Sequence, residues 1–187
     1  MINVNKGELS YLAVNKRKEI LKTILFFSLS AAIFGIGYFS TGSERNPLTI
    51  VAVLGCLPAS KSAVSMIMNL RVKGCSREDA DIIQKRLGEN FGYYNLYFTS
   101  YQKNYEIHHL VVGDLSIIAY SADEKTEASG FEEHIRTMLK KEGISNMNVK
   151  LYREREKYIS RVEQLLKSNH ETGKENRVVS LLFSISL

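Results

Sequence analysis

The sequence predicts a membrane helical hairpin followed by a soluble α+β domain, on three observations. Two apolar runs, Thr23–Ser40 and Leu48–Leu70, flank a short polar break at Thr41–Pro47. Beyond residue 75, segments with strand-like alternation stand between segments with helical periodicity. Most of the net charge of +5 lies in the N-terminal part of the chain.

The first apolar run has 18 residues without a charge. As a helix it would be about 27 Å long, close to the roughly 30 Å hydrocarbon core of a bilayer. The second run follows Asn46-Pro47, a pair suited to the start of a helix, but it contains Pro58 and Lys61. Pro58 predicts a kink, and Lys61 lies about 22 Å along the helix, where a lysine can extend to the headgroups. We therefore expect a two-span hairpin over residues 23–70.

Two alternatives stay open for the apolar runs. Both could form a soluble hairpin with an apolar core. The second run could instead be a half-span that ends at Pro58, followed by an interfacial helix that carries Val64, Ile67 and Leu70.

Small residues predict how the two runs pack. They lie on one side of the first run (Ser28, Ala31, Ala32, Gly35) and at every fourth position of the second (Gly55, Ala59, Ala63). Such faces let helix backbones approach closely in lipid. We expect them to join the two helices, and they could also join copies of the chain in a homo-oligomer.

The charge distribution indicates a lipid partner and an orientation. Residues 1–70 carry seven Lys/Arg against three Glu, and the remainder has a net charge of only +1, which argues against a nucleic-acid partner. Basic residues flank both runs, so we expect a two-span protein of the cell membrane with both termini in the cytoplasm. The residues expected to contact lipid headgroups are Lys16, Arg17, Lys18, Lys61, Arg71 and Lys73.

Three further segments are predicted around the hairpin. Residues 1–22 are expected to form an interfacial lead-in helix, and residues 76–168 a cytosolic α/β domain. Residues 169–187 are expected to form a tail. Its apolar end, Val178–Leu187, is too short to span a bilayer and could add a strand or dip into the membrane.

The soluble domain is expected to have the order helix, three strands, helix, strand, helix. The first helix begins at Ser76, and Gly113-Asp114 predicts a tight turn within a three-strand antiparallel meander. The other predicted elements are the strands Tyr94–Tyr101, Tyr105–Val112, Leu115–Ser121 and Met147–Tyr152, and the helices Phe131–Glu142 and Glu154–Ser168.

The sequence predicts no catalytic, cofactor-binding or metal site. His108 and His109 are adjacent in a predicted strand and so should point to opposite faces, and His134 and His170 have no ligand at metal spacing. The chain has no glycine-rich phosphate loop, no C-x-x-C pair and no G-x-S-x-G motif. Two cysteines make no disulfide framework.

Tyrosines crowd the first predicted β-hairpin. Tyr94, Tyr97, Tyr101 and Tyr105 could form an aromatic surface for a cytosolic or membrane protein partner. Alternation in a half-buried sheet explains the same residues.

Two resemblances extend this reading. Residues 57–76 (LPASKSAVSMIMNLRVKGCS), 94–112 (YNLYFTSYQKNYEIHHLVV) and 132–143 (EEHIRTMLKKEG) resemble an uncharacterised bacterial family of two-span membrane proteins with a cytosolic α/β domain. This resemblance implies location and layout. The order helix, three strands, helix, strand is also similar to the core of restriction-endonuclease-like folds.

We expect a non-enzymatic, membrane-anchored α/β module that binds a protein or regulates a membrane process. The alternative is an endonuclease-like, phosphodiester-processing domain. Enzymes with such folds resemble one another in having an acidic residue near the second strand and Glu-x-Lys on the third. Asp114 could fill the first role, and Glu132 and Glu133 could add carboxylates, but the segment Leu115–Tyr120 has neither an acid nor a lysine. A third hypothesis is a lipid handler that uses Lys61.

Overall fold

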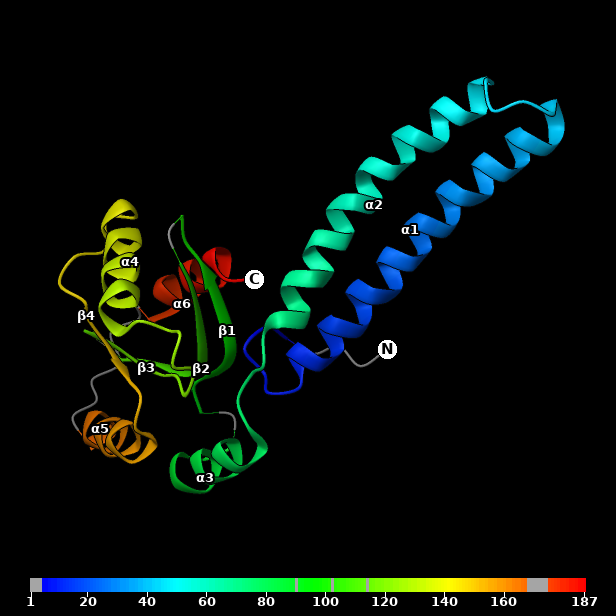
Figure 1. The fold of residues 1–187 in the computed structure, drawn as a ribbon. Helices are drawn as coiled ribbons and strands as arrows, with labels where there is room; N and C mark the ends of the chain where they lie inside the picture. Colours follow the sequence, from blue (N-terminus) through cyan, green and yellow to red (C-terminus); the bar gives the residue numbers. More distant parts are fainter. Residues whose placement is uncertain (1–4, 90, 102, 114, 168–174) are drawn as a thin grey trace. The chain divides into compact units, whose positions relative to one another are not determined.

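The computed structural model describes residues 5–89, 91–101, 103–113, 115–167 and 175–187. The chain forms two compact units, Leu12–Lys73 and a second unit made of the N-terminal residues up to Tyr11 together with Gly74–Leu187 (Figure 1). The elements are α1 (Tyr11–Thr41), α2 (Pro47–Arg71), α3 (Arg77–Leu87), β1 (Tyr93–Thr99), β2 (Asn104–Val112), β3 (Ser116–Tyr120), α4 (Ala128–Lys141), β4 (Asn148–Tyr152), α5 (Arg155–Lys167) and α6 (Glu175–Ile185).

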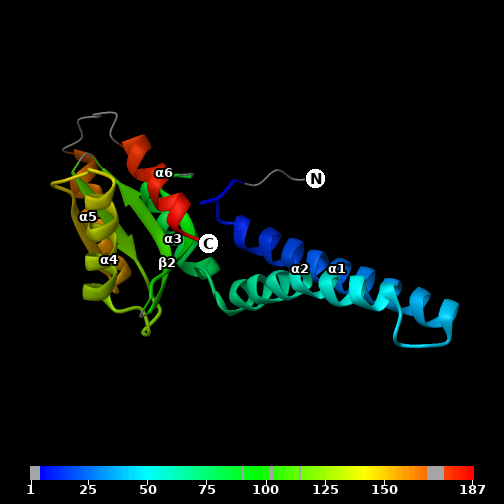
Figure 2. The same cartoon turned by 90° about the horizontal axis from the view of Figure 1, so that it is seen from above.

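The first unit is a hairpin of two long helices that lie side by side (Figure 2). The side-chain oxygen of Asn46 caps α2 by accepting a 3.0 Å hydrogen bond from the backbone nitrogen of Thr49, and Pro47 occupies the first turn. Helix α1 begins already at Tyr11, so most of the predicted lead-in continues into the first apolar run as one helix. Residues 5–10 precede α1 and belong to the other unit.

Small and polar residues form the interface between α1 and α2. On α1 the buried positions Thr23, Ser30 and Gly37 are seven residues apart, and on α2 the buried positions are Ala52, Ala59, Ser62 and Asn69. Spacing by seven residues is the repeat of helices that pack with a left-handed crossing. The expected face of α1 was wrong: Ser28, Ala31 and Ala32 are exposed. A homo-oligomer through that outward face stays a prediction.

Large apolar side chains cover the outside of this hairpin. Leu25, Phe39 and Leu57, for example, expose between 62% and 87% of their surface. Apolar residues outside and small or polar residues inside is the arrangement that a lipid environment favours, because lipid does not drive apolar side chains together. By length and composition, both α1 and α2 could cross a membrane.

The second unit is built on a mixed sheet with the strand order β1-β2-β3-β4. Strands β1, β2 and β3 pair antiparallel in sequence, and β4 joins β3 in parallel after the crossover through α4. The predicted order of helices and strands is therefore present from α3 to α5. The predicted three-strand meander, however, is only part of a four-stranded mixed sheet.

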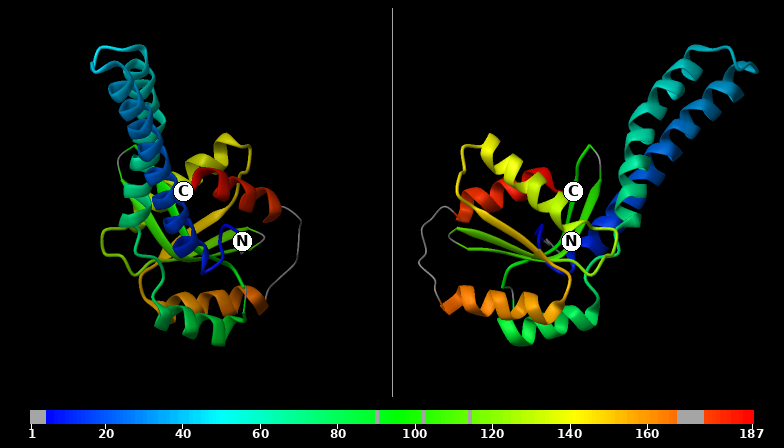
Figure 3. Two further views of the ribbon diagram at one scale, coloured as in Figure 1. Left: turned by 90° about the vertical axis from the view of Figure 1, so that its right-hand side faces the viewer. Right: turned by 60° about the vertical axis from the view of Figure 1, so that its left-hand side comes forward.

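Helices cover both faces of the sheet (Figure 3). Helices α4 and α6 pack on one face through Phe131, Ile135, Leu139, Val178 and Leu182. Helices α3 and α5 pack on the other face through Ala80, Ile83, Tyr158, Ile159 and Val162. The apolar C-terminal segment therefore forms a core helix of this unit instead of a strand or a membrane-dipping tail, and only its last residues, Ser186 and Leu187, pair with β1.

Both edges of the sheet are covered. On the outer side of β1, the backbone nitrogen of Tyr94 donates to the carbonyl oxygen of Gly7, and the backbone nitrogen of Leu187 donates to that of Tyr97. On β4, the Glu132 carboxylate accepts a hydrogen bond from the backbone nitrogen of Leu151. Such covering prevents the edge strands from pairing with other chains.

Candidate functional site

A cleft of about 520 Å³ lies between the turn from β1 to β2 and helix α4. Strand β1 contributes its last residue, Thr99, the turn contributes Ser100 and Tyr101, and β2 contributes Tyr105. Helix α4 contributes Gly130, Glu133, His134, Thr137, Met138 and Lys141. The side chain of Tyr101 is fully exposed, which is unusual for a large aromatic residue.

Gly130 sets the depth of this cleft. A methyl group on Gly130 would lie 2.9 Å from the hydroxyl oxygen of Tyr105, so only glycine allows the phenol to lie against the first turn of α4. The Tyr105 ring is buried and packs edge-on against Phe131, with 5.9 Å between the ring centroids. A buried aromatic floor therefore underlies the cleft.

His134 is a titratable group that lines the cleft. Its ring lies 5.9 Å from that of Tyr105, and its Nε2 atom is buried without a hydrogen-bond partner within the described residues. Partial burial and the nearby Lys141 ammonium both lower the pKa of His134. A buried nitrogen without a partner is costly, so a ligand that bonded to it would gain free energy.

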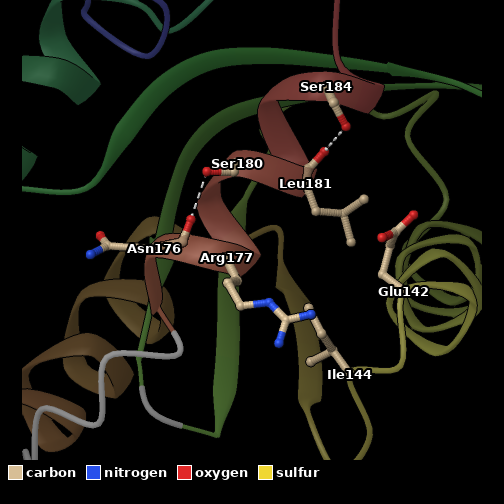
Figure 4. Close-up of a pocket in the computed structure, with 7 residues that line it drawn as sticks. All are labelled: Glu142, Ile144, Asn176, Arg177, Ser180, Leu181 and Ser184. Atoms are coloured by element: carbon tan, nitrogen blue, oxygen red, sulfur yellow. Dashed lines mark hydrogen bonds between the residues drawn. The ribbon is translucent and has the colours of Figure 1, made fainter.

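A second cleft, of about 420 Å³, lies between the end of α4 and helix α6 (Figure 4). Its Ser180 and Ser184 hydroxyls donate to the carbonyl oxygens of Asn176 and Leu181 on their own helix. The Arg177 side chain extends across the cleft towards Ile144. Because both hydroxyls already have partners, this cleft offers a ligand fewer polar groups than the Tyr101 cleft does.

A third and smaller cleft, of about 270 Å³, lies along β3 and β4. Its lysine, Lys150, is already paired with the Glu132 carboxylate at 3.3 Å. We therefore take the Tyr101 cleft as the candidate functional site.

The structure divides the four predicted surface tyrosines. Tyr94 and Tyr105 are buried, so they cannot form an exposed aromatic surface. Tyr97 is half-buried and Tyr101 is exposed, so a role in partner binding stays a prediction for these two. Among the residues that line the cleft, the sequence singled out Tyr101 and Tyr105, but not His134, Thr137 and Lys141, which come from α4.

The buried titratable residues on the opposite face serve the fold. The His109 ring nitrogens bond to the Tyr158 hydroxyl and to the carbonyl oxygen of Phe91, and burial lowers the pKa of His109 to about 4. Burial also raises the pKa of the Cys75 thiol to about 12, which makes this cysteine a poor nucleophile at neutral pH. Asp79 pairs with Arg155 at 2.7 Å.

Adjacent His108 and His109 do not alternate across the sheet as expected. The His108 ring lies 6.0 Å from that of Tyr120 and the His109 ring 5.7 Å from that of Tyr158, and these two tyrosines pack together. The described residues nevertheless contain no group of three or more His, Cys, Asp or Glu residues that could hold a metal ion.

The acidic position proposed for nuclease chemistry, Asp114, lies outside the described residues. A carboxylate that sequence reasoning missed, Glu106, is buried on the second strand. One of its oxygens accepts a 2.6 Å hydrogen bond from the backbone nitrogen of Gly74 and lies 3.5 Å from Nε2 of His108. Glu132 bonds to the backbone nitrogen of Leu151, and the third strand, SIIAY, carries neither an acid nor a lysine.

One of the six basic residues expected at lipid headgroups has a different partner. The Lys16 ammonium donates to the carbonyl oxygen of Val72, just beyond the end of α2, where a cation is favoured by the helix dipole. The other five are exposed (Arg17, Lys18, Lys61, Arg71, Lys73), and their contact with lipid stays a prediction.

Comparison of the chain with protein-family models, with curated proteins and with solved structures gave no match. The resemblances drawn from the sequence therefore stay predictions, and the functional argument rests on the geometry of the site.

Proposed function

We propose that this protein is a membrane-anchored, non-enzymatic module whose α/β unit binds a segment of a partner protein in the Tyr101 cleft. The observation that carries this proposal is the fully exposed Tyr101 at the rim of a cleft with an aromatic floor. Tyrosine at such a position supplies a large contact area at a low cost in conformational entropy. A regulatory role at the membrane follows if partner binding alters a membrane process.

The way in which the hairpin is tethered supports this proposal. The chain returns from the hairpin directly into the α/β unit at Gly74 and Cys75, and both backbone nitrogens are hydrogen-bonded there, to Glu106 and Asn95. Asn95 also donates to the carbonyl oxygen of Leu9, just before α1. Both chain segments that join the hairpin are thus hydrogen-bonded to the β1–β2 pair, whose turn lines the Tyr101 cleft.

We further propose that α1 and α2 span the cell membrane with both termini in the cytoplasm. The support is the apolar outer surface of the hairpin and the basic residues that flank both helices. The cleft would then face cytosolic partners and the cytosolic parts of other membrane proteins.

Photocrosslinking in cells tests the proposed binding. A photoreactive phenylalanine analogue at Tyr101 should give a discrete adduct with a second protein. Leu115, the other large exposed apolar residue of the α/β unit within the described residues, provides the matched control. Adducts of equal yield from both positions, or none from Tyr101, would contradict a binding site at the cleft.

Phosphodiester processing is the alternative function. Its support is the buried Glu106 on the second strand. The third strand, however, lacks the glutamate and the lysine that this chemistry is expected to use. Full-length protein in mild detergent can be incubated with plasmid and single-stranded DNA plus Mg²⁺ or Mn²⁺. DNA cleavage that is lost in Glu106→Ala would favour the alternative over partner binding.

A further inference from the structure

We infer that the Tyr101 cleft recognises an anionic side chain, a carboxylate or a phosphate, on the partner segment, and that His134 and Lys141 hold it. This inference rests on the proposed function, because it names the chemistry of the group bound at the same site. It follows from three properties of the cleft: a row of polar groups along α4, polar nitrogens without partners among the described residues, and two basic side chains, His134 and Lys141, against one acidic side chain, Glu133.

The first property is a matter of helical spacing. His134, Thr137 and Lys141 are three and four residues apart, so their side chains form one row along α4. The whole row lines the cleft. An anion bound in the middle of the row, beside Thr137, would have a basic group on either side.

The second property is the number of donors without a partner. The Nε2 atom of His134 is buried and makes no hydrogen bond with the part of the chain that the structure describes. The Lys141 ammonium forms no ion pair with any described residue, in contrast to Lys103 on β2's side of the turn, which pairs with Glu127. Hydrogen bonds to a charged acceptor are about twice as strong as those between neutral groups, so an anion satisfies the Lys141 ammonium, and Nε2 of His134 when it carries a proton, best.

The third property is the charge around His134. The groups that line the cleft with it are Lys141 and Glu133 from α4, the phenol of Tyr105 from β2 and the phenol of Tyr101 from the turn. Partial burial, and after it the repulsion by the Lys141 ammonium, lower the pKa of His134. An anion between them would remove this repulsion and favour protonated His134. Glu133 would repel the same anion.

These opposing charges give the inference its sharpest test. Lys141→Gln should weaken binding of the partner, whereas Glu133→Gln should strengthen it. Lys140→Gln is the matched control, because Lys140 is exposed on the same helix turn and does not line the cleft. If binding depended only on the net charge of the protein, Lys141→Gln and Lys140→Gln would weaken it equally.

A direct measurement follows the His134 ring by NMR in full-length protein in neutral detergent. The His134 signal is identified by its loss in His134→Gln. Titration in chloride is then compared with titration in acetate and in inorganic phosphate. At saturation, an anion in the cleft should raise the pKa of His134 by about one unit, and Lys141→Gln should reduce that shift.

The two anions distinguish a carboxylate site from a phosphate site, since the larger shift identifies the preferred class. Equal pKa values in all three anions, or a shift that Lys141→Gln does not reduce, would overturn the inference. The photocrosslink from Tyr101 separates it from the proposed function. If the adduct forms but its yield is unchanged in Lys141→Gln and Glu133→Gln, partner binding stands and anion recognition fails. Strong binding to anionic lipid vesicles that is lost in Lys141→Gln would also contradict a protein partner.

Discussion

The backbone nitrogen of Cys75 donates a 2.7 Å hydrogen bond to the side-chain oxygen of Asn95. The Asn95 amide nitrogen donates in turn to the carbonyl oxygen of Leu9 at 2.9 Å. One buried side chain thus joins the segment before α1, the segment after α2 and the edge strand of the sheet. Asn95 also has a φ of +58°, a conformation that asparagine and glycine adopt more readily than other residues.

Substitutions at Asn95 should separate these two roles. Asn95→Gly keeps the backbone conformation but leaves two backbone groups without partners, which should cost about 1–3 kcal/mol. Asn95→Ala should cost about 1 kcal/mol more, because alanine disfavours this φ. Denaturant unfolding of the full chain in mild detergent, followed by near-UV circular dichroism, measures both. An alanine variant more stable than the glycine variant would show that the folded state does not require the positive φ at position 95.

Asn95 also shows where prediction from the sequence fails. Tyr94 packs against α3 and α5, whereas Leu96 and Phe98 pack against α4 and α6, so the strand changes face at Asn95. Strict alternation through a strand would place Tyr94 and Leu96 on the same face of the sheet. The positive φ that causes the change depends on tertiary hydrogen bonds to Leu9 and Cys75, which no local pattern in the strand indicates.

The α/β unit should lose stability as the pH falls from about 6.5 to about 4 because of His109. Burial lowers the pKa of His109 from 6.5 to about 4 in the folded state. In this interval the unfolded chain binds a proton that the folded chain does not, so folding becomes less favourable as the pH falls. A difference of this size corresponds to about 3 kcal/mol once both states are protonated.

His109→Gln provides the comparison for this pH effect. Thermal unfolding of both proteins should be measured between pH 7.5 and pH 4. The variant should be less stable at neutral pH, because it disturbs the bonds to Tyr158 and Phe91, but it should lose less stability between pH 6.5 and pH 4. Parallel pH profiles for the two proteins would assign the loss to other groups.

Helices and strands could be predicted because their periodicities are local. The C-terminal helix shows the limit of this approach. Val178 and Leu182 are four residues apart and fully buried, but the surrounding segment lacks charged residues, so its helical period was not distinctive. The cleft could not be predicted either, because β2 and α4 supply Tyr105 and His134 from segments that are far apart in the sequence.

The proposed orientation predicts opposite labelling of two exposed positions. Single cysteines at Ser43, between α1 and α2, and at Glu124, in the loop after β3, can be placed in a chain with Cys56→Ala and Cys75→Ala. A membrane-impermeant maleimide added to intact cells should label Ser43→Cys and spare Glu124→Cys until the cells are lysed. The reverse pattern would place the α/β unit outside. Labelling at both positions in intact cells would contradict the proposed arrangement, in which the membrane separates Ser43 from Glu124.

Replacement of glycine by leucine should lower the stability of the hairpin at Gly55 but not at Gly35. A Cβ atom on Gly55 would lie 2.8 Å from the hydroxyl oxygen of Ser30, whereas one on Gly35 would meet no atom within 4 Å. Gly55→Leu should therefore separate α1 from α2 and lower the stability of the hairpin by about 1–3 kcal/mol, and Gly35→Leu should not.

The glycine pair also tests whether copies of the chain associate. Gly35 lies near the small residues Ala31 and Ala32, which are exposed on the outer face of α1. If this face joins copies of the chain, Gly35→Leu should convert a larger species into a smaller one in size-exclusion chromatography with light scattering, with the thermal unfolding of the hairpin maintained. Gly55→Leu should instead lower the thermal stability of the hairpin and leave the association of the chains unchanged, because the neighbour of Gly55 is Ser30 of the same chain. Equal effects of the two substitutions on hairpin stability would contradict the packing of α1 against α2 through Thr23, Ser30 and Gly37.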